Sequence, residues 1–193
     1  MLAYLAGTST KRILLIRHGQ TAKDKIKRYI GQTETRLNQH GKNQAHALAH
    51  YLANVPLERI ICSDLHRSRQ TAQILARPHC LKIQENPDLR EIYLGQWEGR
   101  SFADIQKNEP ENFRLRGENL AEFRPPGGES FADLQARVVP IFTGLFSGIP
   151  KNIAIVAHAG VNRVVICHFL GLALDKLFIL GQDYGSLSIL ETR

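Results

Sequence analysis

Cysteine is scarce in this sequence, whose 193 residues include only Cys62, Cys80 and Cys167. Three well-separated cysteines fit neither a disulfide framework nor a C-x-x-C redox or zinc motif, and indicate reduced thiols. Long apolar runs are missing too: Ile153–Ala157, one of the longest, falls far short of the roughly 18 residues of a membrane-spanning helix. The first ten residues carry no positive charge before their short apolar stretch, so they predict no signal peptide. We therefore expect a cytoplasmic protein with no membrane partner.

The composition, with 43% hydrophobic and 22% charged residues, excludes a disordered chain and predicts a single domain over residues 1–193. A chain of this length buries roughly 70% of the surface that it exposes when unfolded. Its core therefore needs no disulfide or metal for stability.

Positive charge is in excess, and most of it gathers in one segment. The formal net charge is +7, and residues 11–36 alone contribute +6, whereas residues 101–133 carry −3. Such a balance is compatible with nucleic acid, an acidic membrane surface or a small anionic substrate. The concentration of charge favours one local anion site over a generally basic surface.

Apolar strand patterns alternate with helical ones along the chain. This order predicts an α/β fold, a three-layer α/β/α domain around a largely parallel sheet. Strands are expected at 12–16, 59–62, 82–84, 152–157 and 186–190; helices are expected at 41–54, 66–76, 101–107, 114–123, 130–146 and 160–170. The pattern weakens around 92–130, which we interpret as a lid-like excursion from the sheet.

Two of the expected strands end in the same way, by delivering a histidine to the carboxyl edge of the sheet. These are His18 and His158, and glycines follow them closely at Gly19 and Gly160. For an isolated histidine a structural role is the more common interpretation, but the repeated strand-end placement favours a site. Ligands of parallel sheets bind at this edge, and glycine lets the backbone approach them.

Six segments in order resemble the histidine phosphatase superfamily, also called phosphoglycerate-mutase-like. Arg17–Thr21 is similar to its R-H-G-[ET]-[ST] signature, and Val156–Val161 to its second-histidine segment. Arg28–Gly31 matches its R-x-x-G element, and Leu89–Gly99 matches its L-x-E-x-x-x-G-x-W-E-G motif. The two remaining segments are Leu37–Gly41 and Ser63–Ala72. The resemblance implies a phosphoglycerate-mutase-like fold over nearly the whole chain after Thr10.

The resemblance also implies roles for individual residues. His18 becomes the nucleophile that is phosphorylated, and Glu91 donates a proton to the leaving oxygen. The phosphoryl group is surrounded by Arg17, Arg67 and His158, with Gly19 and Ala159 beside it. No metal and no cofactor is implied.

The chemistry requires these residue types. A histidine attacks phosphorus only when its ring is neutral, and two nearby guanidinium groups disfavour the imidazolium. Arginine keeps its charge and binds phosphate oxygens with two donors at once. A carboxylic acid beside a dianionic phosphate favours its protonated form, which suits Glu91 as a proton donor.

Further residues are candidates for substrate contact, and some of them depart from the family pattern. Asp24 stands where the family often has Asn, Gln20 replaces the usual Glu, and Ala159 replaces a Gly. A carboxylate at position 24 repels phosphate unless neighbouring basic residues neutralise it. The complete set of candidates is Gln20, Asp24, Arg28, Arg114, Arg116 and Gln182.

Rival sites fail on spacing. A cysteine phosphatase needs C-x5-R, but the sixth residue after Cys62 is Ser68, and the sequence contains no G-x-x-x-x-G-K-[ST] phosphate loop. His46 and His50 have a metal-ligand spacing, but without the H-E-x-x-H pattern we interpret them as solvated.

The function predicted is metal-independent hydrolysis of a small phosphorylated metabolite through phosphohistidine. The 92–130 excursion resembles most the alpha-ribazole phosphatase branch, which makes alpha-ribazole 5'-phosphate the first substrate to test. Phosphoglycerate mutase-type transfer is the alternative within the family. The alternative of another class is a non-catalytic phosphate- or nucleic-acid-binding module, which the lack of aromatics other than Tyr29 near the basic segment disfavours. A homodimer is left open.

Overall fold

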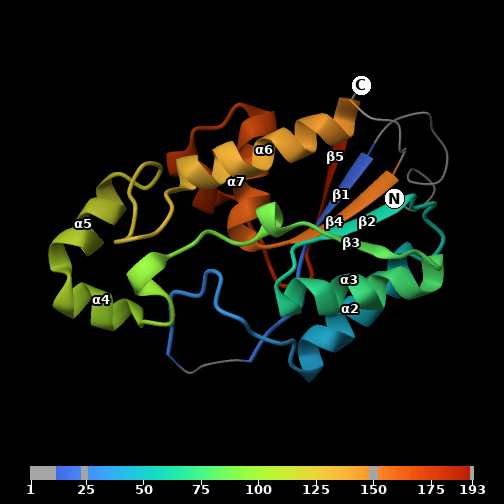
Figure 1. The fold of residues 1–193 in the computed structure, drawn as a ribbon, viewed down its shortest axis with the longest axis horizontal. Helices are drawn as coiled ribbons and strands as arrows, with labels where there is room; N and C mark the ends of the chain where they lie inside the picture. Colours follow the sequence, from blue (N-terminus) through green and yellow to red (C-terminus); the bar gives the residue numbers. More distant parts are fainter. Residues whose placement is uncertain (1–11, 23–25, 148–151, 192–193) are drawn as a thin grey trace.

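The computed structural model describes residues 12–22, 26–147 and 152–191, and its centre is a sheet of five strands in the order β3-β2-β4-β1-β5 (Figure 1). The strands are β1 (Arg12–Arg17), β2 (Arg59–Cys62), β3 (Ile83–Glu85), β4 (Asn152–Ala157) and β5 (Leu187–Glu191). The pairs β1–β4, β2–β4 and β2–β3 are parallel, and β5 joins the edge of β1 antiparallel. The predicted α/β fold with a largely parallel sheet is confirmed.

Helices cover both faces of the sheet. In Figure 1, α2 and α3 lie on one side of the strands and α6 and α7 on the other, which gives three layers. The α-helices are α2 (Gln39–Leu52), α3 (His66–Ala76), α4 (Phe102–Asn108), α5 (Pro110–Glu118), α6 (Phe131–Ser147) and α7 (Ala159–Leu170). Short 3-10 turns are η1 (Arg77–His79), η2 (Pro87–Leu89), η3 (Gly95–Trp97) and η4 (Leu174–Ile179). Among the described residues, no helix combines the length and apolar character needed to cross a membrane.

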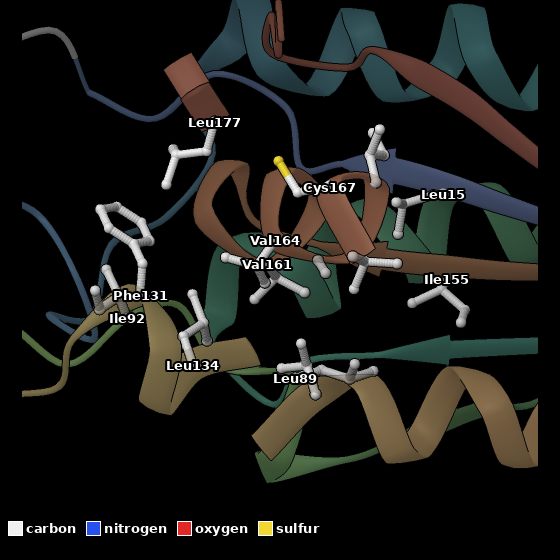
Figure 2. Close-up of a cluster of buried hydrophobic side chains, with 14 of the residues drawn as sticks. Leu15, Leu89, Ile92, Phe131, Leu134, Ile155, Val161, Val164, Cys167 and Leu177 are labelled. Carbon is white, nitrogen blue, oxygen red and sulfur yellow. The ribbon is translucent and has the colours of Figure 1, made fainter. Parts of the chain in front are cut away.

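The apolar run of β1 packs both layers at once. Leu15 belongs to the hydrophobic cluster on the side of α6 and α7, whereas Leu14 belongs to the cluster on the side of α2 and α3. Successive strand side chains point to opposite faces, so a strand covered on both sides needs a continuous apolar run. Figure 2 shows the first cluster, in which Leu15 and Ile155 of the sheet meet Val161 and Val164 of α7. This packing fixes the strand ends that carry the two histidines.

α3 covers His66–Ala76 as predicted, and a residue distant in the sequence stabilises its first turn. The N-cap residue is Leu65, and the carboxylate of Glu34 accepts the N–H of His66 at 2.9 Å. The neighbouring Asp64 binds the guanidinium of Arg90 through both oxygens, at 2.8 and 2.6 Å.

The helix expected at 114–123 is displaced toward the N-terminus. α5 begins at Pro110, whose missing N–H is harmless in a first turn, and ends at Glu118. The next residues form a turn in which the N–H of Ala121 donates to the carboxylate of Asp175 at 3.2 Å. This tertiary bond ends the helix where the local sequence permits its continuation.

The 92–130 segment contains η3, α4 and α5, and Figure 1 shows α4 and α5 apart from the sheet. Backbone hydrogen bonds tie the segment to the chain that follows β1: Tyr29 N donates to Arg100 O at 2.9 Å, and Phe102 N to Lys27 O at 3.1 Å. Trp97 is fully buried at the centre of this contact. The segment therefore lies over the loop between β1 and α2.

Candidate active site

His18 and His158 meet because β1 and β4 are neighbours in the sheet. Arg17 lies opposite Ala157 in the parallel register, so the residue after each strand emerges at the same edge. The two rings are 5.1 Å apart between centroids, edge to face. Both side chains are buried, with exposed fractions of 5% for His18 and 0% for His158. The structure thus brings together the two histidines that the strand pattern singled out.

The hydrogen bonds of His18 define which ring nitrogen is free to react. Nδ1 lies 2.8 Å from the carbonyl oxygen of Gly19, which can only accept, so Nδ1 carries the proton. Nε2 lies 3.2 Å from Nε of Arg67, which can only donate, so Nε2 presents its lone pair. Burial lowers the pKa of His18 well below 6.5, and the charges of Arg67 and Arg17 lower it further against the hydrogen bond to Gly19. His18 is therefore a neutral imidazole with a nucleophilic Nε2.

Arg67 is held at the start of α3 by carbonyl groups of the loop that follows β1. Its Nη2 donates to Gly31 O at 2.6 Å and its Nη1 to Thr33 O at 2.8 Å. Burial lowers the pKa of this guanidinium, and the nearby carboxylates of Glu91 and Glu34 counter that effect. An arginine remains charged under such conditions, so a fixed cation stands beside Nε2 of His18.

Arg17 is positioned by the loop before β5. Its Nη1 donates to the carbonyl of Gln182 at 2.5 Å, and its guanidinium carbon lies 3.8 Å from the centre of the Tyr184 ring. The same Tyr184 ring lies 5.6 Å from the ring of His18. No role was predicted for Tyr184, because its sequence neighbours give no sign that it lies beside Arg17 at the end of β1.

His158 is the N-cap residue of α7, and its ring is completely enclosed. Within the described part of the chain neither ring nitrogen has a hydrogen-bond partner. Burial lowers the pKa of His158 well below 6.5, and the charges of Arg67, His18 and Arg17 act in the same direction. A buried polar group without a partner costs about 1–3 kcal/mol. A phosphate oxygen accepting from this ring would remove that cost.

Glu91 reaches the site from the segment after β3. Its Oε2 accepts the N–H of Gly160 at 3.0 Å and its Oε1 that of Ile92 at 3.0 Å. A Cβ atom at position 160 would come within 2.3 Å of Oε1, so only glycine allows this contact. We expected Gly160 to make room for a ligand, but the group that approaches it is the carboxyl group of Glu91.

A cavity of about 350 Å³ opens at this edge of the sheet. Reactive and cationic groups face it from β1, from the loop after β1, from α3 and from the loop before β5. Among its walls are Arg17, His18, Gln20, Arg28, Arg67, Glu91 and Tyr184. A second cavity of about 330 Å³ shares Arg17, Arg28 and Glu91 and is lined mainly by apolar and aromatic side chains. The first cavity is therefore lined by charged groups, and the second, adjoining cavity is mainly apolar.

The remaining predicted residues divide between the two cavities and the scaffold. Arg116 and Ala159 line the second cavity, and no carboxylate pairs with Arg116 among the described residues. Arg114 lies on the exposed side of α5, paired with Glu111 and Glu118, and lines neither cavity.

Gln182 and Gly19 also belong to the scaffold. Gln182 is buried and bonds Asn162 through its side chain at 2.9 Å. The N–H of Gly19 donates to Thr71 Oγ1 at 3.1 Å, so it does not point to the cavity. Asp24 lies outside the described residues. Among these residues, no group of three or more His, Cys, Asp or Glu side chains is arranged to hold a metal ion.

Comparison with known proteins places the chain in a family. Residues 13–193 match the model of the histidine phosphatase superfamily, branch 1. The chain is 30% identical over 182 residues to the adenosylcobalamin/alpha-ribazole phosphatase of Escherichia coli (strain K12), covering 93% of this chain and 89% of that protein. It is 37% identical over 196 residues to a bifunctional protein of Mycobacterium tuberculosis (strain ATCC 25618 / H37Rv), covering 96% of this chain but only 51% of that relative.

A solved structure agrees with this placement. The native structure of a mycobacterial glucosyl-3-phosphoglycerate phosphatase superimposes with a TM-score of 0.84 at 31% identity, covering 94% of this chain and 90% of that one. The chain belongs to the histidine phosphatase superfamily, as its motifs predicted. It is a phosphatase of that superfamily, a phosphomonoester hydrolase.

The two buried histidines predict how stability responds to pH. Their pKa values lie well below 6.5 in the folded protein, so below pH 6.5 the unfolded chain binds protons that the native protein does not. The free energy of unfolding should therefore keep its full value above pH 6.5 and decrease as the pH drops toward the pKa values of the folded state. Urea unfolding followed across this range, with imidazole nitrogen NMR on the native protein, measures both. A His18 ring that becomes protonated at or above pH 6.5 would contradict the assignment.

Proposed function

We propose that this enzyme hydrolyses phosphomonoesters through a phosphohistidine on His18. The observation that carries the proposal is the unprotonated Nε2 of His18, which accepts a hydrogen bond from Arg67 in a cavity that Arg17 and Glu91 also line. A neutral nucleophile, fixed cations and a carboxyl group in one cavity are the parts that phosphoryl transfer needs.

In the first step Nε2 forms a bond to phosphorus while the ester P–O bond breaks. Arg17 and Arg67 balance the charge on the equatorial oxygens, and the ring of His158 donates to the same group. Glu91, in its protonated form, transfers its proton to the leaving oxygen, which departs as an alcohol.

In the second step water replaces the alcohol. The Glu91 carboxylate takes a proton from water, the water oxygen bonds to phosphorus, and the P–N bond breaks. Inorganic phosphate is released, Nε2 recovers its lone pair, and Glu91 is again protonated. Every group returns to its starting state without a metal or cofactor.

For the substrate we propose a small phosphorylated metabolite whose alcohol portion carries an aromatic ring, and alpha-ribazole 5'-phosphate as the first choice. The second cavity supports this because Tyr29, Phe102, Phe123 and Phe178 line it beside two guanidinium groups, Arg116 and Arg163. The guanidinium carbon of Arg163 lies 5.2 Å from the centre of the Phe178 ring. Flat rings stack favourably on aromatic faces and on guanidinium planes. In this proposal the 92–130 segment encloses the leaving group.

A substrate panel tests the function. We expect kcat/KM for alpha-ribazole 5'-phosphate to exceed that for glucosyl-3-phosphoglycerate, 3-phosphoglycerate and an aryl phosphate, with unchanged rates in a chelator. A higher kcat/KM for glucosyl-3-phosphoglycerate would contradict the proposed substrate but support the proposed reaction. Isomerisation of 3-phosphoglycerate in place of hydrolysis would establish mutase chemistry, and strict dependence on added magnesium would contradict the mechanism.

Replacing Glu91 by glutamine should separate substrates by their leaving groups. A poor alkoxide leaving group needs the proton, so hydrolysis of an alkyl phosphate should fall by about 100-fold or more. An aryl oxide leaves readily without this proton, so the rate of aryl phosphate hydrolysis should fall much less. The ratio of the two rates is independent of the amount of folded enzyme. Equal losses on both substrates would show that Glu91 is not the proton donor.

A further inference from the structure

Three consecutive residues after β1, Gly31, Gln32 and Thr33, connect the catalytic cation to the proposed acid. The carbonyls of Gly31 and Thr33 accept from Arg67 at 2.6 and 2.8 Å. The side-chain amide of Gln32 donates to the carbonyl of Glu91 at 3.0 Å. We call these residues the 31–33 loop. Its position sets where Arg67 stands relative to His18.

The 31–33 loop belongs to neither a helix nor a strand, and a single carboxylate satisfies its backbone. The N–H groups of Gly31, Gln32 and Thr33 donate to Glu98 at 3.2, 2.7 and 3.2 Å. The hydroxyl of Thr33 donates to the same side chain at 2.5 Å. Four donors from three residues therefore converge on Glu98.

Glu98 is itself fixed by the 92–130 segment. It follows the η3 turn, where Trp97 is fully buried and donates through Nε1 to Glu109 at 2.9 Å. The N–H of Leu94 also donates to Glu98, at 3.3 Å. A Cβ atom at position 31 would come within 2.3 Å of Glu98 Oε1, so Gly31 is what lets the carboxylate reach the loop.

The chemistry of these contacts requires a carboxylate. All the partners of Glu98 are donors, and an ionised carboxylate has only acceptor sites. Within the described chain no basic side chain forms an ion pair with Glu98, so no cation competes with these backbone donors for its oxygens. An amide in its place would turn an N–H₂ group toward an N–H donor and release part of the loop.

We propose that Glu98 is a positioning residue for catalysis, acting through the 31–33 loop on Arg67 and on Glu91. The inference rests on the proposed function, because it assigns Arg67 to the phosphoryl group. Glu98 touches no reacting atom and lines neither cavity. It acts on the reaction through its hydrogen bonds to the 31–33 loop and through its charge, which counters the lowering of the Arg67 pKa by burial.

The test is Glu98→Gln, with kcat/KM on an aryl phosphate and the dissociation constant of orthovanadate, a mimic of the phosphoryl transition state. A displacement of about 1 Å at a catalytic group costs up to about 100-fold in rate, so we expect a 10- to 100-fold loss in kcat/KM and weaker vanadate binding. The acid limb of the pH profile should also move to higher pH, since Arg67 lowers the pKa of His18.

A matched control separates this role from general destabilisation. Asp133 also accepts a backbone N–H, from Ser130 at 2.9 Å, and lines neither cavity. Asp133→Asn should lower thermal stability but leave the vanadate constant unchanged. If Glu98→Gln does not fold, Thr33→Val removes one donor of the loop, and we expect a loss of a few-fold in the same two measurements.

A double-variant cycle tests the route. In an Arg67→Ala background, Glu98→Gln should weaken vanadate binding by less than about twofold further, because residues that act as a unit are not additive. Full additivity, or a wild-type vanadate constant in Glu98→Gln, would overturn the inference. Neither outcome affects the proposed function, which the substrate panel and the His18→Ala variant test separately.

Discussion

His18→Ala should reduce kcat by at least about 1,000-fold, since removal of a covalent nucleophile leaves only binding and electrostatic contributions. The ring is enclosed, and Nε2 is the ring nitrogen that carries the lone pair, since Nδ1 donates to Gly19. Turnover of an aryl phosphate measures the loss. Wild-type enzyme quenched in alkali should carry phosphate on the His18 peptide that acid then releases, and the variant should carry none.

His46→Ala is the matched control for this substitution. His46 is exposed on α2 and lines neither cavity, so its removal should leave kcat unchanged. More than a few percent of wild-type activity in His18→Ala would rule out the phosphohistidine mechanism. The chain would then be a phosphatase with another nucleophile.

Arg67→Ala should be the second most damaging change, with kcat/KM lower by about 100- to 1,000-fold. Losing one preorganised donor to a developing charge has an effect of this size. The variant also leaves the carbonyl of the buried Gly31 without its partner, so the free energy of unfolding should fall by about 1–3 kcal/mol, whereas the carbonyl of the exposed Thr33 can bind water. Steady-state kinetics and urea unfolding measure the two effects separately.

The control lies on the same helix. Arg69 is paired with Glu85 at 2.8 Å and lines neither cavity, so Arg69→Ala should keep kcat/KM within about threefold of wild type. If Arg69→Ala is as damaging as Arg67→Ala, the loss reflects α3 as a whole, not a cation at the phosphoryl group.

The local sequence predicted a residue's position best where that position depends on the strand or helix to which the residue belongs. The apolar runs before His18 and His158 predicted buried strands with histidines at their carboxyl ends, and the structure has both. The position of Arg67 at the start of α3 was likewise predicted from its motif. These positions follow from the two-residue period of a strand and the roughly 3.6-residue period of a helix, and both periods can be recognised from neighbouring residues.

Spacing was less informative in the 92–130 segment and in the loop before β5. Arg114 and Arg116 looked equivalent, yet Arg114 is paired on the outside of α5 while Arg116 faces the second cavity. Gln182 was a candidate contact, but Tyr184 is the residue that lines the first cavity. Which face of an irregular segment turns inward is set by the surface against which it packs.

The α/β alternation, the two strand-end histidines and the order of the motifs that mark a histidine phosphatase all follow from the amino-acid sequence. The pairing of β1 with β4, the stacking of Tyr184 on Arg17 and the hydrogen bonds from the 31–33 loop to Glu98 and Arg67 follow only from the folded structure. Each of these contacts joins groups from distant parts of the chain. A periodic pattern states that a residue is buried, but the partner that satisfies its hydrogen bonds is chosen by the packing of the whole fold.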